Sequence, residues 1–557
     1  GGAFNVYRSS LSDPSKAVAV TRFAKHPVRF LSAAADGTLA FAWDGELYTQ
    51  KGEGAPKKVD IRIQVDPARA QERYVPVNSG LTELEVSPTG KEVAFVVRGE
   101  VYVSSLEGGH TRRITDTPGQ ERSVGFSPDG RTLVYAGERD GSWNIYSARI
   151  VRKDEPAFYA ASQIEEKALV ATPADEFQPL FSPDGKELAY LEERTTLKVL
   201  NLASGKSRTA MPGDRNYSYA DGDQDFSWSP DGRWLACGIN VGLGWLRDVA
   251  VVAADGSGKR VNLSRSGHLD VRPRFSQDGS LVYWATDREG YRNLNQQSAT
   301  LDIHGLFLTQ KAFDRHQLTK EEFALVKERE DKEAKDKAKE EKKDEKKEDR
   351  KEVVIEWEGL EDRRVRLSAH TAELGDALLS RNGEKLYYLA RFEKGFDLWS
   401  TELRTRETKL LAKLDARQAS FRLSADGKFL LVRADGRAAK VDAESGKRDA
   451  VALNGEMRLR EAEERAAIYE HAWRQLEKKF YVKDLHGVDW PFYVQAYRRF
   501  LPHISNNVDF AELLSELLGE LNASHTGGRY GAPQDNKDAT AALGLFFDPQ
   551  HAGKGLK

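Results

Sequence analysis

The five residues Phe181-Ser182-Pro183-Asp184-Gly185 decide the fold, because the same phrase recurs along the chain. Ser-Pro-Asp-Gly forms a tight turn: proline presets φ, aspartate hydrogen-bonds its own backbone, and glycine supplies a positive φ. Residues 126–130 are an identical copy, and looser copies occur at 35–37, 86–90, 228–232, 275–279, 380–383 and 424–427. A repeat of roughly 40–50 residues built from turns and short strands is typical of β-propeller blades.

Short apolar strands follow these turns, as in Leu188-Ala189-Tyr190. A second signature comes a few residues later, for example Trp143-Asn144-Ile145-Tyr146 after Gly141. Strands and turns at this spacing predict a mainly β protein of four-stranded antiparallel blades. A β-sandwich is the alternative, but sandwiches do not repeat one turn chemistry so faithfully.

The chain opens with the second signature alone, Phe4-Asn5-Val6-Tyr7 after Gly2-Ala3. We therefore expect the sequence to begin within a blade. Residues 1–75 are predicted to be the end of a first propeller, and residues 76–454 a second propeller.

Composition excludes several classes of protein. The 557 residues are 39% hydrophobic with a formal net charge of −3, which gives no strong attraction to nucleic acid or anionic membranes. No apolar run approaches the roughly 20 residues of a membrane-spanning helix. Cys237 is the only cysteine, so a disulfide within the chain is excluded. Because a chain without disulfides is compatible with the reducing cytoplasm, we expect a cytoplasmic protein, with the periplasm as the alternative.

A highly charged segment interrupts the second propeller at residues 325–352. It consists almost entirely of Lys, Glu and Asp with alternating signs, and it lacks aromatic residues. Such a composition cannot bury a core, so we predict a solvated insertion, partly helical or disordered. Docking of a charged partner is the alternative role.

After Gly455 the repeat stops and helical periodicity begins. Apolar residues at steps of three and four predict a first helix with one buried face: Tyr469, Ala472, Trp473, Leu476 and Phe480. Asp489 is predicted to cap a second helix that has Pro491 in its first turn. Asp509 is predicted to cap a third helix, with Glu512 completing a capping box.

The third predicted helix ends in Leu521-Asn522-Ala523-Ser524-His525-Thr526-Gly527-Gly528. Loops after helices often present catalytic groups, and Ser524 and His525 are chemically able side chains. A structural role is the alternative, since a histidine near a helix C-terminus can bond the last carbonyls.

Three features together resemble the tricorn-type serine peptidases. They are the turn repeats, the helical module with His486-Gly487-Val488-Asp489-Trp490, and the segment Ala523–Gly527. The resemblance implies that residues 455–535 are a helical first core domain and that 536–557 begin a PDZ domain. It also implies that His525 is the general base of a catalytic tetrad and that Ser524 assists it. An imidazole near neutral pH suits the removal of a proton from a serine nucleophile.

One departure from the family pattern concerns the nucleophile. No serine follows Ser524, so the nucleophile that the resemblance implies lies outside this sequence. The first hypothesis is therefore a serine peptidase that degrades oligopeptides, with propellers that guide them to the active site. The resemblance also implies a homo-oligomer.

The second hypothesis is a non-catalytic propeller that binds peptides or proteins. A prolyl-oligopeptidase-like hydrolase ranks last, because its Gly-x-Ser-x-Gly elbow does not occur. No cofactor or metal is expected: there is no His-Glu-x-x-His motif and no phosphate-binding loop.

Overall fold

The computed structural model describes residues 4–62, 72–218, 220–242, 246–292, 299–340 and 352–531. The chain divides into two compact units, Gly1–Ala70 and Gln71–Lys557. The first unit contains two antiparallel sheets: β1 (Tyr7–Ser10) with β2 (Asp13–Ala19), and β3 (Arg29–Ala33), β4 (Thr38–Trp43), β5 (Glu46–Lys51) and β6 (Lys57–Lys58). The predicted start of a PDZ domain at 536–557 lies outside the described residues.

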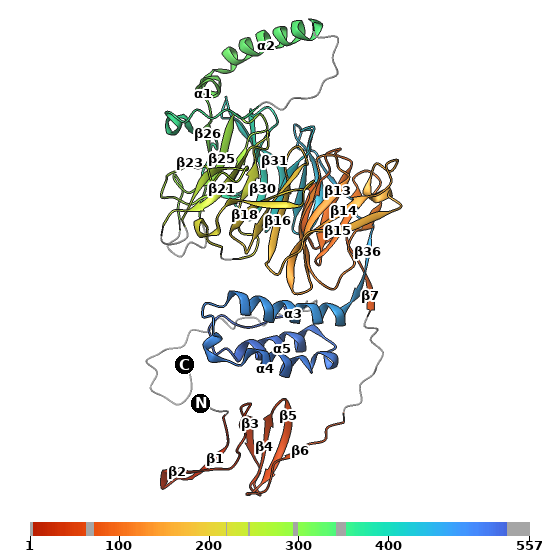
Figure 1. The fold of residues 1–557 in the computed structure, drawn as a ribbon, viewed down its shortest axis with the longest axis vertical. Coiled ribbons are helices and arrows are strands. Elements are labelled where there is room, and N and C mark those ends of the chain that lie inside the picture. The colour runs from red at the N-terminus through yellow and green to blue at the C-terminus, as the bar shows by residue number, and fades with distance from the viewer. Residues whose placement is uncertain are drawn as a thin grey trace, which may run out of the picture. The chain divides into compact units, whose positions relative to one another are not determined.

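Seven four-stranded antiparallel sheets, each of four consecutive strands, follow in the second unit as blades 1 to 7 (Figure 1). Blades 1 and 2 comprise β8 (Leu81–Val86), β9 (Glu92–Val97), β10 (Glu100–Ser105) and β11 (Thr111–Arg113), then β12 (Glu121–Phe126), β13 (Thr132–Arg139), β14 (Ser142–Ile150) and β15 (Ile164–Val170). Blades 3 and 4 comprise β16 (Glu176–Phe181), β17 (Glu187–Glu192), β18 (Thr196–Asn201) and β19 (Lys206–Met211), then β20 (Phe226–Trp228), β21 (Trp234–Asn240), β22 (Arg247–Ala253) and β23 (Arg260–Asn262).

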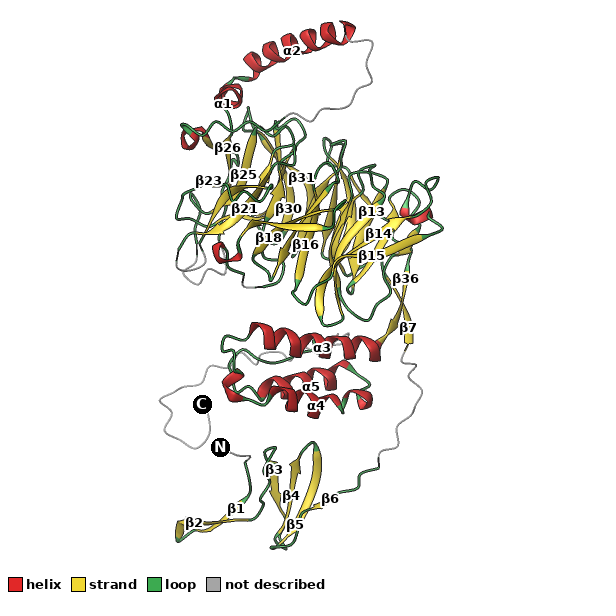
Figure 2. Ribbon diagram, viewed as in Figure 1, coloured by secondary structure: helices red, strands yellow, loops and turns green. Residues whose placement is uncertain are grey.

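Blade 5 comprises β24 (Asp270–Phe275), β25 (Leu281–Thr286), β26 (Asp302–Phe307) and β27 (Arg364–Arg366). Blades 6 and 7 comprise β28 (Glu373–Leu379), β29 (Lys385–Arg391), β30 (Phe396–Glu402) and β31 (Thr408–Ala416), then β32 (Ala419–Leu423), β33 (Phe429–Ala434), β34 (Arg437–Asp442) and β35 (Arg448–Ala450). The prediction of a mainly β fold with four-stranded blades and a helical region after them is confirmed (Figure 2).

The ring closes by contact between blade 7 and blade 1, without exchange of a strand. The amide of Leu81 donates to the carbonyl of Gly436, and the Arg422 guanidinium lies 2.7 Å from the Glu85 carboxylate. The segments that lead into and out of the propeller, β7 (Glu72–Pro76) and β36 (Glu456–Arg460), pair antiparallel as a two-stranded ribbon.

The recurrent turn has the chemistry that its sequence predicts. Ser127 Oγ donates to Asp129 Oδ1 at 2.5 Å, and the same carboxylate oxygen accepts the amide of Arg131 at 3.0 Å. Ser127 Oγ in turn accepts the amide of Thr132 at 2.9 Å, and Gly130 has φ +71°. The same serine and aspartate contacts recur in the turns at 182–187, 229–234, 276–281 and 424–429.

These turns also join neighbouring blades. A Cβ placed on Gly185 would lie 3.3 Å from Cδ of Pro128 in the preceding blade. The same pairing brings Gly130 close to Pro88 and Gly232 close to Pro183. The repeated motif therefore forms a turn within each blade and also part of the contact between that blade and the next blade.

The charged insertion falls within blade 5, between β26 and β27. Two helices lie in this connection: α1 (Gln310–Gln317) precedes the charged segment, and α2 (Lys320–Glu340) contains its first described part. Both project from the propeller on the side away from the C-terminal helices (Figure 1). Arg404 holds the base of α2: its guanidinium stacks 3.6 Å from the ring centre of Phe323 and donates to the carbonyls of Arg315 and Leu318.

The helical region comprises α3 (Glu461–Lys479), α4 (Trp490–Arg498) and α5 (Asn507–Gly519). The one-turn 3-10 helices η4 (Leu485–Gly487) and η5 (Leu501–His503) lie between them. Three further 3-10 helices lie in the propeller: η1 (Phe158–Ala160), η2 (Gly213–Arg215) and η3 (Leu360–Arg363). The helices share one apolar core that includes Tyr469, Trp490 and Leu517.

The predicted cap of α4 is confirmed, and the predicted cap of α5 is wrong. Asp489 accepts the amide of Phe492 at the start of α4. The N-cap of α5 is Asn506, whose side-chain oxygen accepts the amides of Val508 and Asp509. Asp509 lies in the first turn, where its carboxylate accepts the Asn506 amide group at 2.8 Å. The asparagine lies one turn earlier, so it reaches the free amides first.

Candidate functional site

The Ser524 and His525 side chains are exposed on a turn just beyond α5. Leu521, two residues beyond the end of α5, is fully buried, whereas both candidate residues face solvent. His525 has φ +62°, in the left-handed region that non-glycine residues seldom occupy. The fold therefore changes from buried helix to exposed polar turn within three residues.

Two further contacts fix the turn that carries this Ser524–His525 pair. Thr526 Oγ1 donates to the carbonyl of Ala523 at 2.8 Å. A Cβ on Gly528 would lie 3.1 Å from the carbonyl oxygen of Ala511, so the chain passes very close to α5 at this glycine. Contacts on both sides of the pair thus restrict its backbone.

The His486-Gly487-Val488-Asp489-Trp490 motif lies against the same segment. His486 Nδ1 is 3.3 Å from the carbonyl oxygen of Leu521, and His486 Nε2 is 2.7 Å from the Tyr481 hydroxyl. Trp490 is buried in the helical core, where its indole N–H reaches the carbonyl of Trp473. The structure therefore brings together the two motifs, which the sequence separates by more than thirty residues.

Within the described residues, neither the Ser524 nor the His525 side chain makes a hydrogen bond. An imidazole acts as a general base only when it lies within hydrogen-bond reach of the proton that it removes. The described chain thus presents the pair without a hydroxyl nucleophile bonded to His525.

The helix α3 lies across one face of the propeller and is held there by charged contacts. The α3 residues of these contacts recur at helical spacing, and their partners come from the strand ends of blades 1 and 2 and from loops between later blades. The pairs are Glu464 with Arg98, His471 with Glu138, Lys478 with Asp175, and Lys479 with Asp221. This seam of contacts between α3 and the propeller was not predicted from the sequence. The spacing of His471, Arg474 and Lys478 along one helix face was the available signal.

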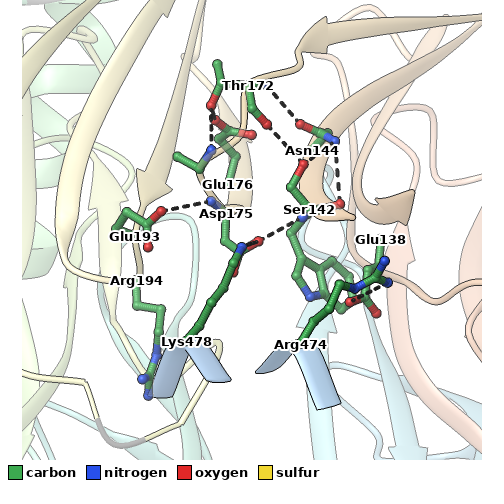
Figure 3. A network of polar contacts seen from close by, with 12 residues as sticks. Glu138, Ser142, Asn144, Thr172, Asp175, Glu176, Glu193, Arg194, Arg474 and Lys478 are labelled. Carbon is green, nitrogen blue, oxygen red and sulfur yellow. Dashed lines mark hydrogen bonds and ion pairs between the residues drawn. The ribbon is translucent and has the colours of Figure 1, made fainter. Parts of the chain in front are cut away.

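Two buried carboxylates anchor the seam (Figure 3). Asp175, 3% exposed at its side chain, accepts Lys478 Nζ at 2.8 Å and the backbone amide of Trp143 at 3.0 Å. Glu138, 5% exposed at its side chain, lies 2.6 Å from His471 Nδ1. Removing the Lys478 or the His471 side chain would leave a desolvated carboxylate with fewer partners, which is costly.

The first strand of each blade lines a central cavity of about 670 Å³. Its walls carry charges of both signs, including Glu85, Arg272, Arg274 and Arg422. Arg422 pairs with Glu85, and Arg274 lies 3.1 Å from Asp376. The cavity therefore combines paired charges with apolar side chains such as Trp228 and Phe275, a lining that can contact both the backbone and the side chains of a peptide.

A second cavity of about 470 Å³ lies between α3 and blades 1 and 2. Its lining includes Ile468 and His471 from α3 and Glu121 from blade 2. Thr82 and Glu83 of β8 line both cavities, so the two adjoin at blade 1. Burial raises the pKa of Glu121 to about 7, with the nearby Glu100 carboxylate acting in the same direction.

Across the described ranges, no cluster of three or more His, Cys, Asp or Glu side chains is arranged to hold a metal ion. In the same part of the chain, no helix has the length and apolar character needed to span a membrane.

Comparison with known proteins gives a consistent result. Residues 461–519, from the start of α3 to the end of α5, match the family model of the tricorn protease C1 domain. The tricorn protease homolog 1 of Streptomyces coelicolor is 26% identical over 555 residues, covering 92% of this chain and 48% of that protein. The tricorn protease homolog of Saccharolobus solfataricus is 23% identical over 567 residues, covering 94% of this chain and 46% of that protein.

The crystal structure of the tricorn protease matches 94% of this chain and 48% of that chain, with a TM-score of 0.70 at 15% identity. At this identity the match supports the fold. The chain spans about half the length of the curated relatives that it matches.

Proposed function

This chain is a tricorn protease homologue with a C1 domain, and we propose that it forms part of a serine peptidase that degrades oligopeptides. In this proposal His525 is the general base, Ser524 assists it, and the serine nucleophile lies outside residues 1–557. Hydrolysis then proceeds through an acyl-enzyme and a tetrahedral oxyanion.

One observation carries the proposal: the Ser524–His525 pair is exposed on a turn that contacts fix on both sides. Thr526 bonds the carbonyl of Ala523 before the pair, and Gly528 packs against α5 after it. A base that must meet a nucleophile from another part of the protein needs an exposed, oriented imidazole. A histidine that only stabilised the helix end would instead bond the carbonyls of α5.

The propeller has a separate role in this proposal, as the route or filter for the peptide. The central cavity is lined by charged side chains of both signs as well as by apolar ones, and the second cavity adjoins it at blade 1. The same cavities support the alternative function, a propeller that binds peptides without cleaving them. Assembly into a homo-oligomer, as the family resemblance implies, is part of the first proposal.

The test is His525→Ala in the full-length protein, assayed with a fluorogenic oligopeptide. We expect the hydrolysis rate to fall at least about a hundredfold, because a general base contributes about that much or more. His503→Ala is the matched control, an exposed histidine of the same helical region. It should leave the rate unchanged.

Peptide binding, measured by fluorescence anisotropy, separates the two functions. Retained binding with lost hydrolysis in the His525→Ala variant agrees with the peptidase proposal. Binding without hydrolysis by the wild-type full-length protein would favour the binding module. Full turnover by the variant would refute the role of His525.

A further inference from the structure

His486 lies in a segment whose backbone is held in an unfavourable conformation. Leu485, His486 and Gly487 have φ values of +50°, +59° and +74°. A non-glycine residue is strained in this region, and such strain persists only where the surroundings enforce it. Leu485 is buried in the helical core, which fixes one side of the segment and turns the His486 ring outward.

The ring of His486 bridges two groups. A carbonyl oxygen only accepts hydrogen bonds, so the 3.3 Å contact with Leu521 requires a proton on His486 Nδ1. In the neutral ring Nε2 then accepts a hydrogen bond from the Tyr481 hydroxyl, 2.7 Å away. The ring of Phe480 packs edge-on at 5.2 Å between centroids, which restricts the imidazole further.

The carbonyl that His486 holds is at the point where the chain leaves α5. The Leu521 side chain is fully buried, and Asn522 immediately after it has φ +49°. Ser524 follows three residues beyond Leu521. The Asn522 amide of the same peptide donates to the carbonyl of Gly519 at 3.0 Å, so His486 and the end of α5 hold this peptide from two sides. A shift of the Leu521 peptide would therefore move the turn, since the next hydrogen bond after it is that of Thr526 to Ala523.

We infer that His486 is a positioning residue for the Ser524–His525 pair, acting through its hydrogen bond to the Leu521 carbonyl. The inference rests on the proposed function and assigns a role to the His486–Trp490 motif. In this role His486 exchanges no proton with substrate. Tyr481 orients the imidazole so that Nδ1 faces the carbonyl.

Two substitutions at one position test the hydrogen bond separately from the backbone. Glycine and asparagine both tolerate a positive φ, so neither His486→Gly nor His486→Asn adds strain. Asparagine places an amide N–H near the position of Nδ1, whereas glycine removes the donor. Circular dichroism and thermal unfolding of the full-length variants check that both fold.

We expect His486→Gly to lower kcat about tenfold to a hundredfold with little change in KM, because small misplacements of catalytic groups cost up to about that much. His486→Asn should recover most of kcat. The pH profile of kcat in the glycine variant should keep its acid limb, because the titrating base is still present.

The outcomes separate this inference from the proposed function. His525→Ala without activity together with full kcat in His486→Gly would overturn the positioning role and leave the peptidase proposal intact. Equal losses in the glycine and asparagine variants would also overturn it, as would loss of the acid limb, since His486 would then itself be the titrating base. Full activity of His525→Ala would instead refute the proposed function.

Discussion

Glu176, the first residue of β16, should make the stability of the propeller depend on pH. Its side chain is fully buried beside Thr172, whose hydroxyl donates to Oε1 (Figure 3). Among the described residues, Oε2 has no hydrogen-bond partner. Loss of hydration on burial raises the pKa of Glu176 to about 7, and the Glu192 and Asp175 carboxylates add to the effect.

The magnitude follows from the two pKa values of this carboxyl. The difference between about 7 in the folded protein and the usual 4.5 corresponds to about 3 kcal/mol, at about 1.4 kcal/mol for each pH unit. Between these values the folded protein binds more protons than the unfolded chain, so the free energy of unfolding falls as pH rises. The full stabilising effect is present below pH 4.5 and is lost above pH 7.

Glu176→Gln should remove this dependence, because the amide resembles the protonated carboxyl and does not ionise. At pH 8 we expect the variant to exceed the wild type in free energy of unfolding by up to about 3 kcal/mol. At pH 4.5 the two proteins should be nearly equal. Glu121 has a similarly raised pKa in both proteins, so its contribution cancels in the comparison.

Urea unfolding followed by tryptophan fluorescence at pH 4.5, 6 and 8 measures the difference. Glu407→Gln, which makes the same chemical change at an exposed site, is the control and should show no pH-dependent gain. A variant that is equally destabilised at all three pH values would refute the reasoning. In that case the carboxylate would be ionised in the fold and required there.

Two further sets of substitutions test contacts between parts of the second unit, both by urea unfolding. Gly383 has φ +72° and open space around it, so Gly383→Ala should lower the free energy of unfolding by about 1–2 kcal/mol. At Gly185 the added Cβ also lies 3.3 Å from the preceding blade, so Gly185→Ala should lower it by about 1 kcal/mol more. Equal losses in the two variants would contradict the contact between blades. Lys478→Met should lower the free energy of unfolding by about 1–3 kcal/mol, because the buried Asp175 carboxylate loses its lysine partner. Lys483→Met, at an exposed site, should not change it. Adding Asp175→Asn should recover part of the Lys478→Met loss, and no recovery would argue against the ion pair.

The blades could be predicted from the sequence because their signal is local. A serine, an aspartate and a glycine within four residues satisfy one another, as Ser127, Asp129 and Gly130 do. No distant residue is needed to fix that geometry, so the turn can be recognised from its own sequence wherever it occurs. The helix stripe that contains Tyr469 and Trp473 is local in the same sense.

The spacing of His471, Arg474 and Lys478 indicates a charged helix face, but the partners of that face could not be predicted because they lie far away in the chain. His471 and Glu138 are separated by 333 residues, and nothing near either residue indicates the other.

The prediction of the α5 cap was wrong for a different reason. Asn506 and Asp509 are both good caps, and the choice depends on where the chain enters the helix, which packing decides. The positive φ of His486 was equally hidden, since histidine does not usually mark such a position.

The helical region is attached to the propeller mainly by charge. The apolar core of α3, α4 and α5 contains only residues of the helical region. The contacts of α3 across the seam include the ion pairs of Glu464, Lys478 and Lys479. His471 adds a hydrogen bond to Glu138 and an edge-on ring contact with Trp143. Added salt weakens exposed pairs such as Arg98 with Glu464, and buried pairs are screened far less. The pair formed by the buried Asp175 should therefore hold the C-terminal end of α3 when the N-terminal end has already loosened. Because α3 carries the packing surface of α4 and α5, the Ser524–His525 pair should keep its own geometry while its placement over the propeller changes with ionic strength.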